Sequence, residues 1–299
     1  MPPSEDRSAT PEQPDLRHLI RAATAILTEA QVPSAESDAI SLAEHVLGID
    51  RLVLVMPPPL PEEFTADYAA VVERRRRREP LQHITGRAHF RHLALQVRPG
   101  VFIPRPETEV VAEHAVSAAH AVRRAGRDPL VVDLCCGAGP IAVSVASEVP
   151  DSSVLAVDAE GAAVDLTLAN AAAARVRIRA MVADVRQEDL LADHEGQVDV
   201  LVANPPYIPP DAVPQQREVR EHDPDLALYG GGPDGLDIPR AVIRAAARLL
   251  RPSGVFIMEH AEVQAGAVRD VVSDTGGFTE VSTAEDLSGR ARMVLARRR

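Results

Sequence analysis

The chain has little or none of several features that mark particular classes of protein. It contains no lysine, and its two cysteines, Cys135 and Cys136, are adjacent in a chain of 299 residues. Adjacent cysteines are unsuited to a structural disulfide, and such sparse use fits the reducing environment of the cytoplasm. No apolar run reaches the roughly 18 residues that span a bilayer. Residues 1–6 lack a basic segment leading into an apolar one, so we expect no signal peptide.

Positive charge is outnumbered by negative charge. The 44 acidic residues outnumber the 32 basic ones, which leaves a formal net charge of −12. Because sequence-independent binding of nucleic acid depends on neutralising phosphates, this balance argues against it. The histidines are scattered without a Cys/His ligand spacing, so no metal is expected. The consecutive arginines at 74–78 are either a solvated helix end or a docking patch for an acidic partner or RNA.

The patterns that are present indicate two folded parts. Residues 1–15 are rich in Pro, Ser, Glu and Asp, which predicts a disordered tail. Residues 16–80 carry helical apolar periodicity interrupted by prolines, which predicts a small helical domain. Residues 81–107 are expected to form a short β-hairpin and a proline-stiffened linker. From 108 to 299, strand and helix patterns alternate, which predicts a doubly wound, Rossmann-like α/β sheet.

This α/β part is expected to contain a mainly parallel sheet with one antiparallel edge. The edge arises because only a short turn separates the last two strand patterns, as in a β-hairpin. The strands are predicted at residues 130–134, 153–157, 178–182, 198–203, 254–259, 278–283 and 291–296. The intervening helices are predicted at residues 140–148, 160–174, 237–250 and 262–275.

The most informative segment follows the apolar run at 198–203. Consecutive prolines cannot continue a strand because neither has a backbone N–H, so the strand must end at Asn204. Ligands bind at such carboxyl ends in open α/β sheets. This end offers the Asn204 amide, the carbonyl oxygen of Pro205 and, after Pro206, the ring of Tyr207. Two acceptors and a flat apolar face suit a planar NH₂ group attached to a carbonyl or a ring.

A glycine-containing turn follows the first predicted strand. Its sequence runs from Cys135 through Gly137 and Gly139 to Pro140, and the glycines let a ligand approach the backbone closely. Proline at the first helical position suits the start of a helix. Taken alone, Gly-x-Gly fits an ordinary βα turn equally well.

Three aspartates end consecutive predicted strands, and together they indicate a nucleoside pocket. Besides Asp133, they are Asp158, placed to accept from ribose hydroxyls, and Asp184, placed to accept from an adenine amino group. One such aspartate can simply cap a helix, but three in series favour a bound nucleoside. No arginine follows Asp158 to meet a 2′-phosphate, and the turn lacks the third glycine of the dinucleotide fingerprint. A mononucleoside is therefore favoured over NADP.

The turn together with Asn-Pro-Pro-Tyr resembles the signature of class I S-adenosylmethionine-dependent methyltransferases that act on amino nitrogens. Longer stretches resemble the HemK/PrmC protein-(glutamine-N5) methyltransferases, over about residues 16–299. These stretches are residues 78–86, 98–109, 218–224, 226–228, 230–237 and 259–260. The resemblance implies a seven-stranded class I methyltransferase sheet and S-adenosylmethionine as cofactor. It also implies a helical substrate-recognition domain and, as substrate, the glutamine of the Gly-Gly-Gln loop in a peptide-chain release factor. The family usually has glycine where Cys135 stands.

The residues and the resemblance together predict the site. The predicted catalytic residues are Asn204, Pro205 and Tyr207. The predicted cofactor-binding residues are Asp133, Cys135, Gly137, Gly139, Asp158, Asp184 and Asn204. The predicted substrate-binding residues are Asn204, Pro205, Pro206, Tyr207, Arg105 and Glu107. Arg105 and Glu107 either close over substrate or cofactor or join the domains through an ion pair, whereas packing roles are expected for Cys135, Cys136, Glu259 and His260.

Three alternatives remain at this point. One is a paralogue that methylates another protein or a small amide or amine. Another is an adenine-N6 nucleic-acid methyltransferase, which also uses Asn-Pro-Pro-Tyr; the net charge of −12 and the lack of an evident target-recognition domain count against it. The last is a non-catalytic binding protein, which the intact residues 204–207 disfavour.

Overall fold

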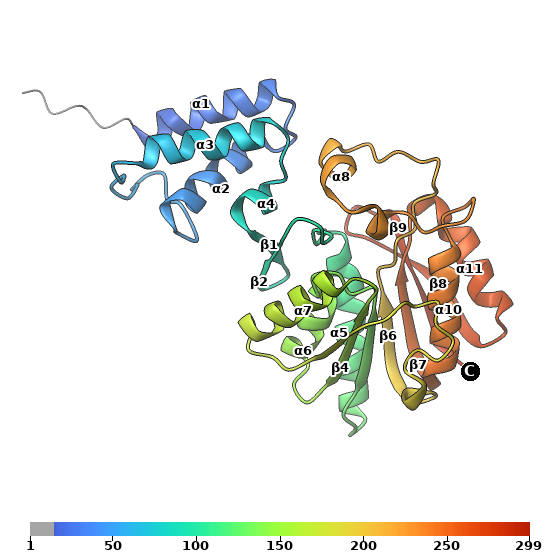
Figure 1. Cartoon of the computed structure of the whole chain (residues 1–299). Coiled ribbons are helices and arrows are strands. Elements are labelled where there is room, and N and C mark those ends of the chain that lie inside the picture. Colours follow the sequence, from blue (N-terminus) through green and yellow to red (C-terminus); the bar gives the residue numbers. More distant parts are fainter. Residues whose placement is uncertain (1–14) are drawn as a thin grey trace, which may run out of the picture. The chain divides into compact units, whose positions relative to one another are not determined.

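The computed structural model describes residues 15–299 (Figure 1). Backbone contacts divide the chain into two compact units, with the boundary between Thr85 and Gly86. Residues 1–14 of the predicted tail lie outside the described residues. Asp15 is the N-cap of the first helix, and its side chain accepts a hydrogen bond from the Arg17 N–H at 3.1 Å.

The first unit is helical and has its own apolar core. Residues 81–85, placed by the sequence with the hairpin segment, form a short helix whose Ile84 is buried in this core. Phe64 and Tyr68 stack at 5.3 Å, and the Tyr68 hydroxyl donates to the Ala39 carbonyl at 2.8 Å. The helices are α1 (Leu16–Glu29), α2 (Ala35–Leu47), α3 (Phe64–Arg76) and α4 (Leu81–Thr85).

The arginine run at the end of α3 has partners within this unit. Arg75 is buried and pairs with Asp38 at 2.7 Å, and Arg74 pairs with Glu79 at 2.5 Å. Glu73 pairs with the two arginines that follow Arg75. These contacts favour a structural helix end over a free docking patch.

The second unit is built on a seven-stranded sheet of order β5-β4-β3-β6-β7-β9-β8. Its first five strands in this order are parallel, whereas β9 runs antiparallel to both β7 and β8. The predicted fold class and antiparallel edge are therefore confirmed. The strands are β3 (Leu130–Leu134), β4 (Ser153–Asp158), β5 (Arg179–Val182), β6 (Val198–Ala203), β7 (Leu250–Glu259), β8 (Phe278–Glu285) and β9 (Ala291–Arg298).

Helices cover both faces of this sheet (Figure 1). On one face the apolar core includes side chains of α5, α6 and α7, and on the other it includes those of α10 and α11. Two short helices between β6 and α10 have no counterpart in the prediction. The helices are α5 (Thr108–Arg124), α6 (Pro140–Glu148), α7 (Gly161–Ala173), α8 (Arg217–His222), α9 (Asp225–Leu228), α10 (Asp237–Leu249) and α11 (Ala265–Asp274), with 3₁₀ turns η1 (Ala192–His194) and η2 (Glu262–Gln264).

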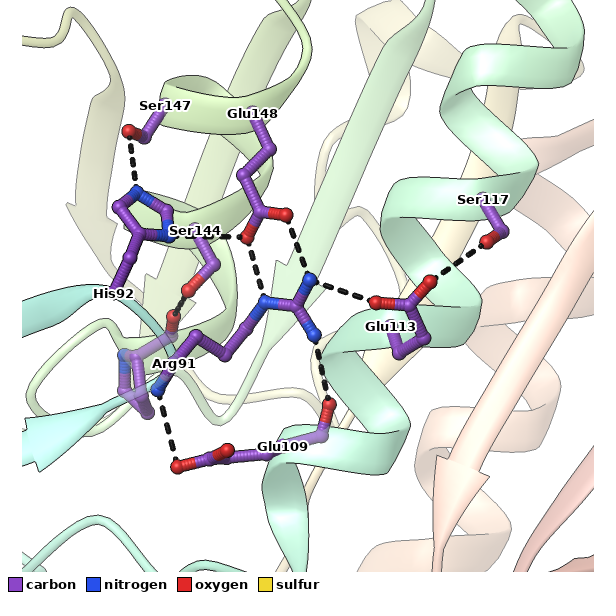
Figure 2. A network of polar contacts seen from close by, with 9 residues as sticks. Arg91, His92, Glu109, Glu113, Ser117, Ser144, Ser147 and Glu148 are labelled. Carbon is purple, nitrogen blue, oxygen red and sulfur yellow. Dashed lines mark hydrogen bonds and ion pairs between the residues drawn. The ribbon is translucent and has the colours of Figure 1, made fainter.

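The predicted hairpin is β1 (Arg87–Phe90) paired with β2 (Leu93–Gln96). Its turn residue Arg91 anchors it to α5 and α6 within the second unit, as Figure 2 shows. The guanidinium forms a bidentate pair with Glu148 of α6, both contacts at 2.6 Å, and meets Glu113 of α5 at 2.7 Å. Within residues 15–299, no helix is long and apolar enough to cross a membrane.

Candidate active site

A cavity of about 460 Å³ opens at the carboxyl ends of β3, β4 and β6, a size typical of small-molecule sites. Most of the predicted site residues line it, although they come from distant parts of the chain. Gly139 and Glu107 are outside the lining; Glu107 is exposed at the N-cap of α5. The predicted residues in the lining are Arg105, Asp133, Cys135, Gly137, Asp158, Asp184, Asn204, Pro205, Pro206 and Tyr207.

The glycine turn has the left-handed backbone that its composition predicts. Cys135, Gly137 and Gly139 have φ of 60°, 56° and 79°. This conformation strains an L side chain, which explains why glycine suits the position of Cys135. A Cβ on Gly137 would meet nothing within 4 Å, whereas a Cβ on Gly139 would lie 2.8 Å from the Thr167 side chain. Gly137 therefore leaves room on the cavity side, and Gly139 permits packing against α7.

Two residues of α7 that sequence reasoning missed hold this turn. The Thr167 hydroxyl donates to the Gly137 carbonyl at 2.8 Å, and the Asn170 amide donates to the Ala138 carbonyl at 2.9 Å. Both side chains are buried. A polar residue on the inner side of a helix is the sequence signal that identifies such supports.

Asp133 is buried and carries one unused acceptor. Its Oδ2 accepts from the Ala142 N–H at 3.0 Å, but Oδ1 has no hydrogen-bond partner within residues 15–299. Burial, with a contribution from nearby Asp158, raises the pKa of Asp133 to about 8. A buried acceptor of this kind suits a ligand that brings a donor or a positive charge.

The two following aspartates differ in exposure. Asp158 is half-buried and accepts from the N–H groups of Gly137 at 2.8 Å and Glu160 at 3.0 Å, while burial raises its pKa. Asp184 is held in the fork of the exposed Arg186, and this hydrogen bonding lowers the Asp184 pKa. All three aspartates line the cavity.

Residues 204–207, here called the Asn204 corner, follow the end of β6 and line the same cavity. Asn204 Nδ2 donates to the Thr108 hydroxyl at 3.2 Å, and no described residue donates to Asn204 Oδ1. The carbonyl of Pro205 likewise accepts no hydrogen bond within residues 15–299. The two acceptors predicted from the sequence are thus both available to a ligand.

The backbone after Asn204 is fixed by contacts that the sequence did not reveal. The buried Gln264 side chain donates to the carbonyls of Tyr207 at 2.8 Å and Asp234 at 3.0 Å. A Cβ on Gly235 would lie 2.3 Å from the Tyr207 carbonyl oxygen, and one on Gly230 would lie 2.7 Å from the Pro206 carbonyl oxygen. The glycine-rich stretch 230–235 therefore packs directly on the corner.

Arg105 acts within the second unit. Its guanidinium pairs with the buried carboxylate of Asp223 and lies 5.0 Å from the centre of the Phe102 ring. Because Arg105 also lines the cavity, the pair ties the linker before α5 to the segment after α8 at the cavity wall.

Two further polar residues contact the Asn204 corner. Thr108 and Glu259 are both buried; the Thr108 hydroxyl donates to Glu259 Oε2 at 2.8 Å, and the Tyr207 hydroxyl lies 3.4 Å from Glu259 Oε1. Sequence reasoning assigned Glu259 to packing and did not single out Thr108. The sequence does carry a signal for Glu259, because a glutamate at the end of a buried strand is unusual. No cluster of potential metal ligands occurs in the described part of the chain.

Comparisons with known proteins agree with this architecture. Residues 18–86 match the model of the PrmC N-terminal domain, and residues 111–217 match the methyltransferase small domain. The chain is 46% identical over 280 residues to the release factor glutamine methyltransferase of Streptomyces coelicolor, covering 92% of this chain and 95% of that protein. The chain belongs to the release factor glutamine methyltransferase family.

The chain is similar to relatives of two kinds. The Mycobacterium tuberculosis release factor glutamine methyltransferase is 42% identical, covering 95% of this chain and 91% of its own. A 4-amino-L-phenylalanine/4-methylamino-L-phenylalanine methyltransferase of Streptomyces pristinaespiralis is 38% identical, covering 92% of each. The predicted family is confirmed, the chain is a methyltransferase, and the family's cofactor is S-adenosylmethionine, as predicted.

Proposed function

We propose that this protein transfers a methyl group from S-adenosylmethionine to the side-chain amide nitrogen of a glutamine in a peptide-chain release factor. The observation that carries the proposal is the Asn204 corner, where two oxygen acceptors that have no hydrogen-bond donor among residues 15–299 border the cavity. Two acceptors match the two N–H bonds of a primary amide.

The cavity residues fit the cofactor. Gly137 leaves open space beside the backbone, and Asp133 Oδ1 is a buried acceptor that suits the ammonium of a methionyl group. Asp158 would accept from the ribose hydroxyls and Asp184 from the adenine amino group. When bound, S-adenosylmethionine supplies an electrophilic methyl group on a sulfonium centre.

The chain's own residues must overcome the poor nucleophilicity of an amide, whose lone pair is delocalised into the carbonyl. Asn204 Oδ1 and the Pro205 carbonyl would accept the two N–H bonds and direct the remaining lobe of the nitrogen at the methyl group. These acceptors also stabilise the positive charge that grows on nitrogen as it becomes pyramidal. Tyr207 would pack on the amide plane.

The substrate assignment is supported by the relatives. The S. coelicolor and M. tuberculosis relatives are named for release factors, whereas the S. pristinaespiralis relative is named for an aromatic amine. The second candidate is therefore a small arylamine, whose NH₂ also offers two N–H bonds. An adenine-N6 activity is disfavoured by the net charge of −12.

We assign substrate recognition to the helical domain, predicted at residues 16–80 and extended by α4 to Thr85, and the reaction to residues 108–299; the hairpin and linker occupy residues 86–107. The reaction would take place in the cytoplasm, where release factors act.

The deciding experiment is methyl transfer from labelled S-adenosylmethionine to purified release factor. Transfer that depends on the loop glutamine, and is lost in its Gln→Ala variant, is expected. The same assay with 4-amino-L-phenylalanine and with duplex DNA tests the competing substrates. Methylation of the arylamine but not of the release factor would replace the first proposal with the second.

A further inference from the structure

A hydrogen-bonded chain links the amide of Asn204 to a buried carboxylate. Asn204 Nδ2 donates to Thr108 Oγ1 at 3.2 Å, and Thr108 Oγ1 donates to Glu259 Oε2 at 2.8 Å. These residues are far apart in sequence, at the end of β6, the start of α5 and the end of β7. Thr108 is 2% exposed and Glu259 is 3% exposed, so water does not readily replace either partner.

The available protons decide which groups donate and which accept along this series of hydrogen bonds. A carboxylate can only accept, and a threonine hydroxyl has a single proton to donate. Because Thr108 gives its proton to Glu259, it can only accept from Asn204, and the atom it faces must be Nδ2. The carbonyl oxygen Oδ1 is then directed to the opposite side of the amide, away from Thr108.

A reversed amide would defeat the proposed reaction. Rotating the Asn204 amide by half a turn would present its NH₂ where a substrate N–H must be accepted. We propose that Glu259 and Thr108 are positioning residues that determine which end of the Asn204 amide faces the methyl acceptor. This inference rests on the proposed function, since it assigns the support of the same site.

The same carboxylate also reaches the other side of the corner. Glu259 Oε1 is 3.4 Å from the Tyr207 hydroxyl, so one buried group contacts Tyr207 directly and is linked to the Asn204 amide through Thr108. The Tyr207 backbone is held separately by Gln264. Loss of the carboxylate therefore changes side-chain orientation at the corner while the main-chain support remains.

The raised pKa of Glu259 makes turnover depend on pH in a way that can be measured. Burial raises the pKa of Glu259 to about 7; the Thr108 hydrogen bond and the charge of Arg292 oppose the rise, and Glu107 adds to it. At a pH below this pKa, a neutral carboxyl group can donate to Thr108. Thr108 can then donate to Asn204, which allows the Asn204 amide to reverse. Turnover should fall as the pH drops through about 7. Burial lowers the pKa of adjacent His260, which moves its titration away from that of Glu259.

The test compares Thr108→Val with Thr108→Ser. Valine has nearly the shape of threonine but no hydroxyl, so kcat should fall by about 10- to 100-fold, as expected for a misplaced reacting group. Serine keeps the hydroxyl and should stay within about threefold of wild type. Rates are expressed per cofactor-binding site, counted by calorimetry with S-adenosylhomocysteine, so that partial unfolding does not imitate a loss of turnover.

Two further variants separate positioning from a merely structural role. In Glu259→Gln the side chain can meet Thr108 with either oxygen or nitrogen, so a loss of about 3- to 10-fold and a flat kcat between pH 6 and 8 are expected. Thr108→Val should have almost no additional effect in an Asn204→Ala background, because it acts through that amide.

The outcomes distinguish the two levels of proposal. If wild-type protein methylates neither release factor nor arylamine, the proposed function fails. If wild-type protein is active but Thr108→Val keeps full kcat per site, or its loss simply adds to that of Asn204→Ala, the positioning role is overturned. If kcat of Glu259→Gln still falls as the pH drops through about 7, the positioning role is likewise overturned.

Discussion

The two sides of the active-site cavity are built in different ways. The side to which we assign the cofactor, here called the cofactor side, consists of consecutive βα units, in which Asp133, Asp158 and Asp184 lie at or just beyond the ends of strands and the glycine turn lies between two adjacent elements. The acceptor side is one short segment, residues 204–207, supported by side chains more than fifty positions away. Local spacing therefore defines the cofactor side, and long-range packing defines the acceptor side. Variants on the first side should change binding, and variants on the second should change turnover.

The largest effect is expected for Asn204→Ala, on the acceptor side. Turnover should fall by about 100-fold or more, as when one preorganised hydrogen-bonding partner is removed from an active site. Cofactor affinity should stay within a few-fold, because the residue's described hydrogen bond is to Thr108. Single-turnover rates and calorimetry with S-adenosylhomocysteine measure the two quantities. Near-normal turnover would remove Asn204 from the mechanism.

Gly235→Ala should affect the same side without touching its side chains. The added carbon would lie 2.3 Å from the Tyr207 carbonyl and 2.7 Å from the Pro209 nitrogen, and these are main-chain atoms that no rotamer change can move. We expect turnover to fall by roughly 10-fold or more through displacement of the corner. Cofactor affinity should change little. Equal losses in both quantities would show that the two sides are not separable.

Gly137→Ala should show the opposite pattern. Its added carbon meets nothing in the cofactor-free protein but projects from the turn that faces the cavity. Cofactor affinity should fall about 10-fold, because the backbone can no longer be approached closely, while the positive φ costs about 1–2 kcal/mol of stability. Gly126→Ala is the matched control: it has φ of 79° and open space around the added carbon, so it should lose stability alone.

The pH dependence of stability should identify the buried acceptor on the cofactor side. Asp133 has a pKa of about 8 in the fold and an ordinary value near 3.8 in the unfolded chain. Between these values the unfolded chain releases a proton that the folded protein keeps, so the free energy of unfolding falls as pH rises from about 4 to about 8. The slope from this group is at most about 1.4 kcal/mol per pH unit.

Denaturant titrations of cofactor-free wild type and Asp133→Asn isolate this contribution, because Glu259 and Asp158 remain in both. The variant should show a shallower decline with pH and bind S-adenosylmethionine more weakly. Parallel pH curves for the two proteins would mean that Asp133 is already ionised in the empty cavity.

The smallest effect is expected for Cys135→Gly. Cys135 has φ of 60°, a conformation that glycine adopts without strain, and this relief should outweigh the greater freedom of glycine in the unfolded chain. A gain of about 0.5–1 kcal/mol is expected, measured as a rise in thermal midpoint. Cofactor affinity and turnover should stay close to wild type. A large change in either would give the thiol a role beyond packing.

Most of the fold was predictable because its strands and helices differ in period and are separated by clear breaks. The seven strands and the antiparallel edge were confirmed. The short helices α8 and α9 were not predicted, since elements of six and four residues carry too few turns for a periodic pattern. The arginine run illustrates a different gap: Glu73 and Glu79 lie within five residues of the arginines that they pair with, but Asp38, the partner of the buried Arg75, comes from α2 and is brought to it only when the helices pack.

The sequence by itself determined where strands end and which groups stand there, because proline, glycine and aspartate act on the backbone next to them. That was sufficient to predict the glycine turn, the strand-end aspartates and the segment at Asn204 as one candidate site, and these residues line one cavity. Only the tertiary structure decided how the corner is held. Thr108 comes from 96 positions before Asn204, and Glu259 from 52 positions after Tyr207. A hydrogen bond between such distant residues depends on the sheet order and on burial, neither of which a local pattern contains.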